Sequence, residues 1–230
     1  MKVQRLRVRF SRGEEVKFIT HLDLMRVWER ALSRAKIDVA YSEGFTPHAQ
    51  LSLAAPLAVG VTSEAELLDV FLASRVTTLH FTREVSAQLP AGIAVLETRE
   101  VGLRGPSLQS ELRGAEYRVR LSGPLAVGDL QKAIKSFLTA ESMPWEQLRD
   151  KQVRKYDIRA LVQDVWQELC DNGTLVLGMR LQTDSSGSGR PEQVTAAMGL
   201  PEPLSIHRTK LILAESSPTH EAWRRQGRFA

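Results

Sequence analysis

Two short segments in which apolar residues alternate with arginines constrain the fold of this 230-residue chain more than any other feature. In Val3–Phe10, three apolar residues alternate with three arginines, and Tyr117–Leu121 repeats the pattern with two arginines. Side chains along a β-strand point to opposite faces in turn, so each segment predicts a strand with an apolar face and an arginine face. Such strands favour an antiparallel sheet that helices cover on one face only.

The elements expected after each segment follow one order: strand, helix, strand, strand, helix, strand. Helices are expected over about residues 21–36 and 80–89, then 130–138 and 191–199; strands are expected over 39–42, 65–73 and 93–101, then 157–169, 174–183 and 206–214. This is the order of the split-βαβ, or ferredoxin-like, fold. The sequence therefore predicts an α+β protein with two tandem, duplicated ferredoxin-like halves and antiparallel sheets.

The predicted halves are residues 1–101 and 116–214. Residues 102–115 lack periodicity and contain Gly, Ser and Pro, which indicates a linker, and residues 215–230 form a basic tail. In the second half, residues 142–155 are expected to be a polar connection. The Asp-Asn-Gly sequence that follows residue 170 is typical of a hairpin turn between two strands.

The first predicted helix has a strong start signal. Thr20 and Asp23 have the spacing of a capping box, with Asp in place of the usual Glu or Gln. One side of the helix is apolar and is expected to face the core. The opposite side carries arginines at four-residue intervals, namely Arg26, Arg30 and Arg34. These arginines are either a solvated surface or a phosphate-binding row.

The charge of the chain is concentrated at its beginning. Residues 1–36 contain ten Lys and Arg against four Asp and Glu, a balance of +6, whereas the whole chain carries +4 and the remainder therefore −2. A basic region beside a near-neutral one is the electrostatic pattern of a protein that binds RNA or another polyanion, although many basic proteins share it.

The composition excludes several classes of site. Cys170 is the only cysteine, so no disulfide framework, thiolate zinc site or cysteine-ligated iron–sulfur cluster can form within this chain. No cofactor and no metal are expected. The arginine-rich beginning is unlike a signal peptide and no apolar run approaches membrane-spanning length, so a cytoplasmic protein without a membrane partner is expected.

The predicted binding residues lie on the first strand and in one loop. Arg5, Arg7 and Arg9 are expected on an open sheet face, where such folds receive single strands. The loop Gly-Phe-Thr-Pro-His adds Phe45, which could stack on an unpaired base, and His48. The alternative for Phe45 is an anchor tucked into the core.

Catalytic signals are weak. His21 with Tyr41 or His48 could form an acid–base pair for RNA cleavage, but spacing alone does not bring them together. No other catalytic motif stands out. An ion pair between Asp157 and Arg159 is the expected use of those two residues.

Two further polar segments are candidates for binding. The Ser-Gly-Ser-Gly-Arg-Pro loop that begins at Ser186 could bind phosphate at a helix start, or serve as a plain connector. His207 and Arg208 on the last predicted strand could join the same polar surface.

Several runs resemble the radical SAM-linked protein family, a bacterial domain of unknown function. They are KFITHLDLMRVWERALSRA at 17–35, AYSEGFTPHAQLSLAAPLAVGVTSEAE at 40–66, KYDIR at 155–159 and SGSGRPEQV…GL…IHRT at 186–209. Ala49 and Ala160 stand where the family has proline. Members occur fused behind a radical SAM enzyme domain or encoded beside one, often near ribosomal-protein and ribonuclease genes.

The resemblance implies a partner role in RNA- or ribosome-related chemistry. The resulting hypothesis is an accessory module without its own catalytic activity that binds RNA, or presents an RNA- or ribosome-related substrate, to a radical SAM enzyme. One alternative is a protein-interaction scaffold with solvated arginines. Another is an endoribonuclease, because tandem ferredoxin-like proteins include RNA-processing enzymes, although fold analogy is poor evidence for chemistry.

Overall fold

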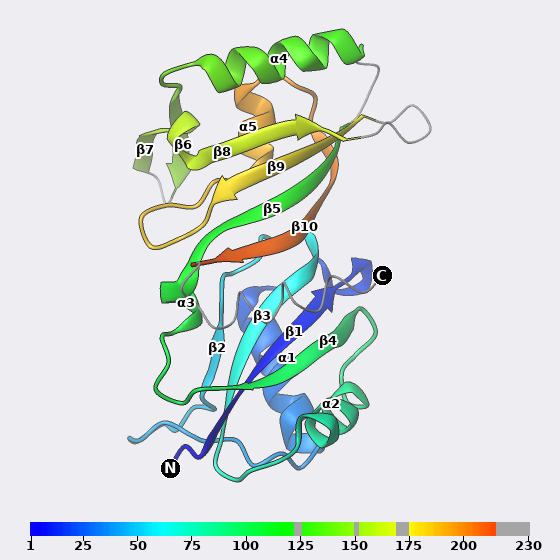
Figure 1. Ribbon diagram of the computed structural model, residues 1–230, viewed down its shortest axis with the longest axis vertical. Helices are drawn as coiled ribbons and strands as arrows, with labels where there is room; N and C mark the ends of the chain where they lie inside the picture. Colours follow the sequence, from blue (N-terminus) through cyan, green and yellow to red (C-terminus); the bar gives the residue numbers. More distant parts are fainter. Residues whose placement is uncertain (122–125, 150–151, 169–174, 215–230) are drawn as a thin grey trace. The chain divides into compact units, whose positions relative to one another are not determined.

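The structure is a computed structural model that describes residues 1–121, 126–149, 152–168 and 175–214 (Figure 1). Its strands are β1 (Gln4–Arg12), β2 (Leu51–Leu53), β3 (Thr62–Leu72), β4 (Ile93–Val101), β5 (Leu112–Leu121), β6 (Pro144–Arg149), β7 (Gln152–Asp157), β8 (Val162–Gln167), β9 (Val176–Gln182) and β10 (Pro203–Leu213). Its α-helices are α1 (His21–Arg34), α2 (Thr78–Ser86), α3 (Leu108–Glu111), α4 (Val127–Thr139) and α5 (Pro191–Ala197), with 3-10 turns η1 (Glu14–Val16) and η2 (Arg159–Leu161). The predicted mixed α+β class with mainly antiparallel pairing is confirmed.

The chain divides into two compact units, each described by itself. Unit 1 comprises Met1–Leu112 and Leu213–Ala230, and unit 2 comprises Arg113–Ile212. Residues 102–115, predicted as a linker, contain α3 and the first residues of β5. The signal for α3 is local, because the Ser107 side chain accepts a hydrogen bond from the backbone N–H of Ser110 and caps the helix start.

Unit 1 has a sheet in the order β4-β1-β3-β2, in which the neighbouring strands are antiparallel. Helices α1 and α2 supply side chains to the same core as the apolar faces of β1 and β3. Phe10 and Trp28 are fully buried in this core with ring centroids 5.0 Å apart, in an edge-to-face contact. One face of the sheet is thus covered by helices, as the alternation in β1 predicts.

Helix α1 begins where the sequence places it. Thr20 accepts a hydrogen bond from the backbone N–H of Asp23, and the Asp23 side chain accepts one from the Thr20 backbone, so the predicted capping box is confirmed. The helix ends at Arg34, and Lys36 then adopts a left-handed φ of 54° that turns the chain back toward the sheet. Each large apolar side chain that α1 buries contributes about 1.5–3 kcal/mol to stability.

Unit 2 has a sheet in the order β10-β5-β9-β8, and α4 and α5 contribute to a core on one face of it. Tyr117, Val119 and Leu121 of β5 are buried, while Arg118 and Arg120 are exposed, as predicted. The strands β8 and β9 that flank the predicted Asp-Asn-Gly turn pair in antiparallel fashion. The turn, Cys170 and the predicted basic tail lie outside the described residues.

The prediction of a polar connection over residues 142–155 is wrong. Strands β6 and β7 form a separate two-stranded hairpin, in which Trp145 lies opposite Tyr156. Both aromatic side chains pack against the core of unit 2, which anchors the hairpin despite its polar composition. The predicted strand over 157–169 is interrupted by η2, and β8 begins only at Val162. Among the described residues, no helix has the length and apolar character needed to cross a bilayer.

Candidate nucleic-acid interface

The arginines of β1 are not on an open surface. Arg5 and Arg7 are 3% and 2% exposed and pair with the fully buried Asp69 of β3. Arg7 Nε lies 2.7 Å from one Asp69 oxygen, and Arg7 Nη1 lies 2.7 Å from Glu111 of α3. Arg5 also donates to the backbone carbonyl of Pro106 at 2.8 Å.

In this buried network, Arg5 and Arg7 pair with the carboxylates of Asp69 and Glu111, and Arg99 of β4 interacts with the same charges. Burial alone lowers the pKa of Arg7, but hydrogen bonds and charge interactions with Asp69 and Glu111 outweigh it, and the pKa is raised above its usual value. Removing one member would leave an uncompensated buried charge. The prediction that Arg5 and Arg7 line an accessible face is therefore wrong, because β3 and α3 supply carboxylates that neutralise and enclose them.

Arg9, the third residue of the predicted row, is half-buried and lies opposite Glu97 of β4. Burial raises the pKa of Glu97, while the charges of Arg99 and Arg9 oppose that rise. Arg9 therefore belongs to a charged cluster on the sheet and not to a continuous exposed row with Arg5 and Arg7.

The loop after α1, residues 41–49, presents its aromatic side chains to solvent. Phe45 is fully exposed, at 110% of the reference surface, and Tyr41 is 59% exposed. The backbone N–H of Ser42 donates to the His48 carbonyl at 2.9 Å, and the His48 N–H donates to the Ser42 hydroxyl at 3.0 Å. These bonds close the loop, and Gly44 supplies a φ of 123° at its tip. The alternative in which Phe45 anchors the loop in the core is wrong.

The candidate catalytic residues are not brought together. His21 is the first residue of α1. Arg12 donates a hydrogen bond to the carbonyl of Ile19, two residues before His21, and lies opposite Ser63 of β3, so His21 lies near this end of β3. The loop at 41–49 instead follows a bridge to Leu72, at the other end of β3. Ser63 and Leu72 are nine residues apart along β3, which corresponds to about 30 Å of strand. His21 is therefore too far from Tyr41 and His48 to act with either as an acid–base pair.

The exposed arginines of unit 1 lie on α1. Arg26, Arg30 and Arg34 are all exposed on the helix, with Arg26 paired to Asp23 at 3.3 Å. The helix row is thus accessible, as both alternatives for it require, whereas Arg5 and Arg7 of the strand are internal.

The segment that contains Asp157 and Arg159 has a structural role through the backbone. Asp157 accepts hydrogen bonds from the N–H groups of Met143 and Arg159 at 2.8 and 2.9 Å, which hold its pKa below the usual range. The Arg159 guanidinium donates to the carbonyls of Val162 and Leu138. The expected pairing of Asp157 with Arg159 is therefore a carboxylate-to-backbone contact.

The loop before α5 is held by its own carboxylate. Asp184 accepts hydrogen bonds from the Ser186 hydroxyl, the Gln182 amide and the backbone N–H groups of Ser186 and Gly187, which lower its pKa to about 2. The N–H groups of Ser186 and Gly187 are therefore bonded to Asp184, and phosphate binding at the start of α5 stays a prediction. Arg208 of β10, another candidate, is 1% exposed.

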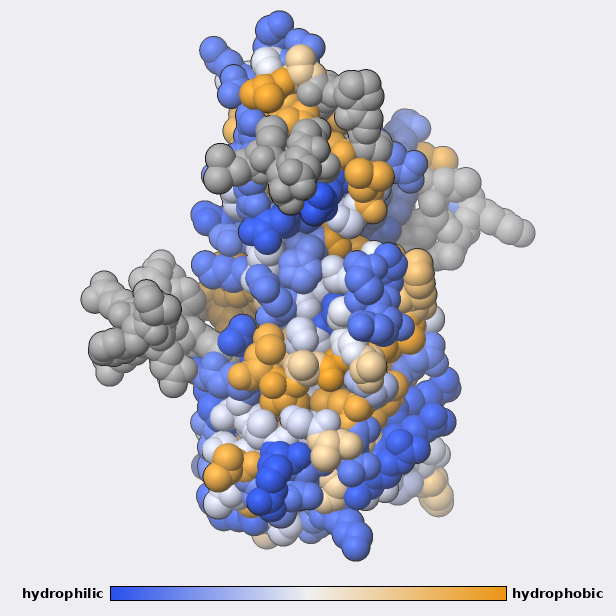
Figure 2. All heavy atoms as spheres, turned by 90° about the vertical axis from the view of Figure 1, so that its right-hand side faces the viewer, coloured by the Kyte–Doolittle hydropathy of each residue, from blue (hydrophilic) through white to orange (hydrophobic). Residues whose placement is uncertain are grey.

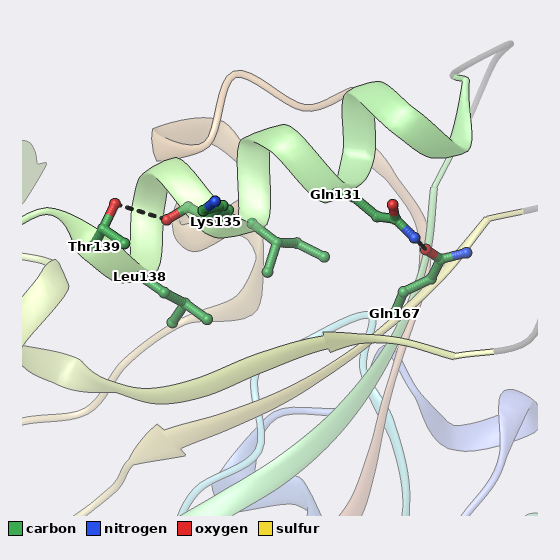
Figure 3. Close-up of a pocket in the computed structure, with 6 residues that line it drawn as sticks. Gln131, Lys135, Leu138, Thr139 and Gln167 are labelled. Carbon is green, nitrogen blue, oxygen red and sulfur yellow. Dashed lines mark hydrogen bonds between the residues drawn. The ribbon is translucent and has the colours of Figure 1, made fainter.

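Unit 2 has a shallow groove of about 440 Å³ between α4 and β8. Ile134 and Leu138 line its apolar part, and Gln131 donates to Gln167 at 3.3 Å at one end (Figure 3). Among the described residues that line it, Lys135 is the one charged side chain, and no acid–base pair is present. Within the described part of the chain, no cluster of three or more His, Cys, Asp or Glu has a metal-binding arrangement.

Sequence reasoning missed Trp166 of β8. Val165 is buried and Trp166 points to the other face, so the same alternation that identifies the strand places this indole on the surface that carries Arg118. The face drawn in Figure 2 carries patches of hydrophobic residues among hydrophilic ones.

The fold and surface described above define an α+β protein with candidate polyanion-binding features. The chain matches, over residues 5–191, the family described as an uncharacterized protein conserved in bacteria (DUF2344), and it belongs to that family. The family description names no radical SAM enzyme, so that partner stays a prediction. No functionally curated protein matches the chain.

Solved structures that resemble the chain belong to H/ACA RNP and Cbf5–Nop10 complexes. They are the archaeal box H/ACA sRNP Nop10–Cbf5 complex (TM-score 0.45, 11% identity, 92% of this chain and 49% of that chain), a Cbf5–Nop10–Gar1 complex (0.47, 10%, 96% and 56%) and an H/ACA RNP bound to a substrate RNA containing 2′-deoxyuridine (0.44, 10%, 96% and 55%). The chain spans about half the length of these matched chains. Likeness at this level carries no argument about function.

Proposed function

We propose that this chain is an RNA-binding module without its own catalytic activity that works with a radical SAM enzyme. The RNA-binding part rests on one observation, the fully exposed Phe45 at the tip of a loop closed by hydrogen bonds. An aromatic ring held in water has no packing role in its own fold. Unpaired bases stack on such rings, and RNA-binding proteins use them for single-stranded segments.

The surroundings of this loop suit a polyanion. Tyr41 and His48 are exposed on the same loop, and the exposed Arg30 and Arg34 lie on the helix that leads into it. Phosphate contacts need accessible cations, which the helix supplies and the buried Arg7 does not. The separation of His21 from the loop supports a binding role over endoribonuclease activity.

The radical SAM partner rests on the sequence resemblance of four runs of this chain to the radical SAM-linked family. Co-purification of such an enzyme with this chain from its own cells is the expected result. Recovery of other protein partners without RNA would favour the interaction-scaffold alternative instead.

We also infer that each unit is a ferredoxin-like half. Numbered from its own first strand, each unit has its strands in the order fourth, first, third, second, with a helix after the first strand and another after the third. Unit 2 differs by the inserted β6–β7 hairpin. The identical order supports a duplicated architecture.

The RNA-binding proposal is tested by fluorescence anisotropy with a short labelled single-stranded RNA. Phe45→Ala should weaken binding by about 1–3 kcal/mol, the usual contribution of one base–aromatic stack. Phe18→Ala is the matched control, because Phe18 is also an exposed phenylalanine, at 70%, and lies outside the loop. Equal affinity of Phe45→Ala and the unaltered chain would contradict the proposal.

A further inference from the structure

The sheet of unit 2 has one face that its helices do not cover. Leu177, Met179 and Leu181 of β9 point into the core shared with α4 and α5. The alternating residues of β9, together with their neighbours on β5 and β8, therefore point the other way. In Figure 1, α5 lies behind this sheet and the opposite face is toward the viewer.

The indole of Trp166 lies over Gly178 on this face. It is the register partner of Gly178 on β9. A Cβ atom built on Gly178 would lie only 2.0 Å from Cε2 of the indole, so the ring occupies the space that any side chain at 178 would fill. Because one side of the indole rests on the strand, the part of Trp166 that stays exposed belongs to its outer side.

Two arginine side chains lie on the same face of the sheet as Trp166. Arg118 of β5 is the partner of Gly178 on its other side, so Trp166, Gly178 and Arg118 cross three neighbouring strands. Arg118 is 51% exposed and pairs with Glu168 at 2.6 Å. Arg120 is two residues further along the same face and is exposed, and no ion pair of its side chain is found within the described residues.

The charge of this face is mixed. Arg180 pairs with Glu116 at 2.8 Å, and Lys210 lies 4.0 Å from the same carboxylate. Exposed ion pairs of this kind contribute little to stability. A phosphate can therefore replace Glu168 as the partner of Arg118 with little loss of stability. Arg120 can contact a phosphate without giving up an ion pair with another described residue.

We infer that this face is a second RNA-binding site, on which one unpaired base stacks on Trp166 and the adjoining phosphates contact Arg118 and Arg120. The inference rests on the proposed function, since it takes RNA as the ligand. It adds a site in unit 2 to the loop in unit 1, and it assigns the ligand class as single-stranded RNA. A duplex keeps its bases stacked and cannot offer one to the indole.

The test measures binding of a short labelled single-stranded RNA by anisotropy over a range of salt concentrations. Trp166→Leu should weaken binding roughly 5- to 150-fold, and Trp166→Phe should retain most of the affinity because it keeps a ring. Arg120→Ala should lower the salt slope by about 0.7, the value for one phosphate contact on a single strand. Lys132→Ala is the control, because Lys132 is 83% exposed on α4, which packs on the other face.

Photocrosslinking to the unaltered chain adds a readout that needs no variant. A single-stranded RNA with a photoreactive uridine should crosslink to the peptide that contains Trp166. The inference is overturned if Trp166→Leu and Arg120→Ala bind as the unaltered chain does and no crosslink maps to β8. In that outcome, a loss with Phe45→Ala would leave the proposed function standing. If the unaltered chain binds no single-stranded RNA, both proposals are wrong.

Discussion

The two arginine-alternating strands, β1 and β5, share a sequence pattern and differ in what surrounds their arginines. In β1, Arg5 and Arg7 are 3% and 2% exposed and pair with buried carboxylates. In β5, Arg118 is 51% exposed, and its partner Glu168 is itself partly exposed. Alternation therefore decides to which face of the sheet an arginine points, and the rest of the fold decides whether that face is exposed to solvent.

The partners explain the difference. Asp69 sits directly opposite Arg7 on β3, and Glu111 of α3 completes the network from a segment more than a hundred residues away in sequence. The residue opposite Arg118 is Gly178, which brings no charge. A buried guanidinium with fixed carboxylates holds a fold together, whereas an exposed one remains available to a ligand.

The largest expected effect is that of Arg7→Ala on stability. It removes a partner of both Asp69 and Glu111 and should lower the free energy of unfolding by about 3–5 kcal/mol, as breaking a buried ion pair does. Urea unfolding followed by circular dichroism measures it. Arg118→Ala is the matched change in β5 and should cost under about 1 kcal/mol. Equal losses from the two changes would break the comparison.

A smaller effect is expected from neutralising one carboxylate in each region. Glu111→Gln keeps an acceptor for Arg7 but leaves part of a buried charge uncompensated, so unfolding should become easier by about 1–3 kcal/mol. Glu168→Gln, the equivalent change beside Arg118, should be close to neutral because water replaces the lost charge interaction. Paired urea titrations of the two variants sharpen the comparison.

The ion pairs Arg7–Glu111 and Arg118–Glu168 should also differ in how their coupling energy responds to salt. Double-mutant cycles measured at low salt and in about 1 M NaCl should show the coupling between Arg118 and Glu168 fall toward zero, because exposed charges are screened over a few ångströms at that salt. The coupling between Arg7 and Glu111 should change little. A buried pair that responds to salt as strongly as the exposed pair would show that water reaches the β1 network.

The smallest effect concerns Asp184, a carboxylate of unit 2 held by neutral donors. Its pKa is about 2 in the folded chain, below the usual 3.8. The contribution of Asp184 to the free energy of unfolding is therefore complete above the unfolded pKa and is lost as the pH falls through 2. Carboxyl-carbon NMR should show the titration of Asp184 near pH 2. Asp184→Asn supplies the assignment, and a midpoint near 3.8 would mean that the loop does not hold the carboxylate.

Local signals in the sequence predicted the fold well. The Thr20–Asp23 capping box and the alternation in β1 and β5 depend on neighbouring residues, and the structure has each of them. The β6–β7 hairpin was missed because its anchoring comes from Trp145 and Tyr156 packing on a core assembled from distant segments.

The site was harder to predict than the fold. Exposure of Phe45 follows from how one loop closes, and the sequence left it open between a surface and a core position. Burial of Arg7 depends on Asp69 and Glu111, and no pattern near Arg7 indicates either. Trp166 could have been found from its outward position in β8, but its support on Gly178 depends on the register of two strands.

Arginine accessibility tests the central claim most directly, namely that β1 carries internal arginines and β5 carries surface ones. The folded chain would be treated with an arginine-selective dicarbonyl reagent, and modified peptides quantified by mass spectrometry over time. Arg118 and Arg120 should react rapidly, while Arg5 and Arg7 should stay unmodified until the chain is unfolded. Modification of Arg5 and Arg7 at the rate of Arg118 in the folded chain would contradict the account.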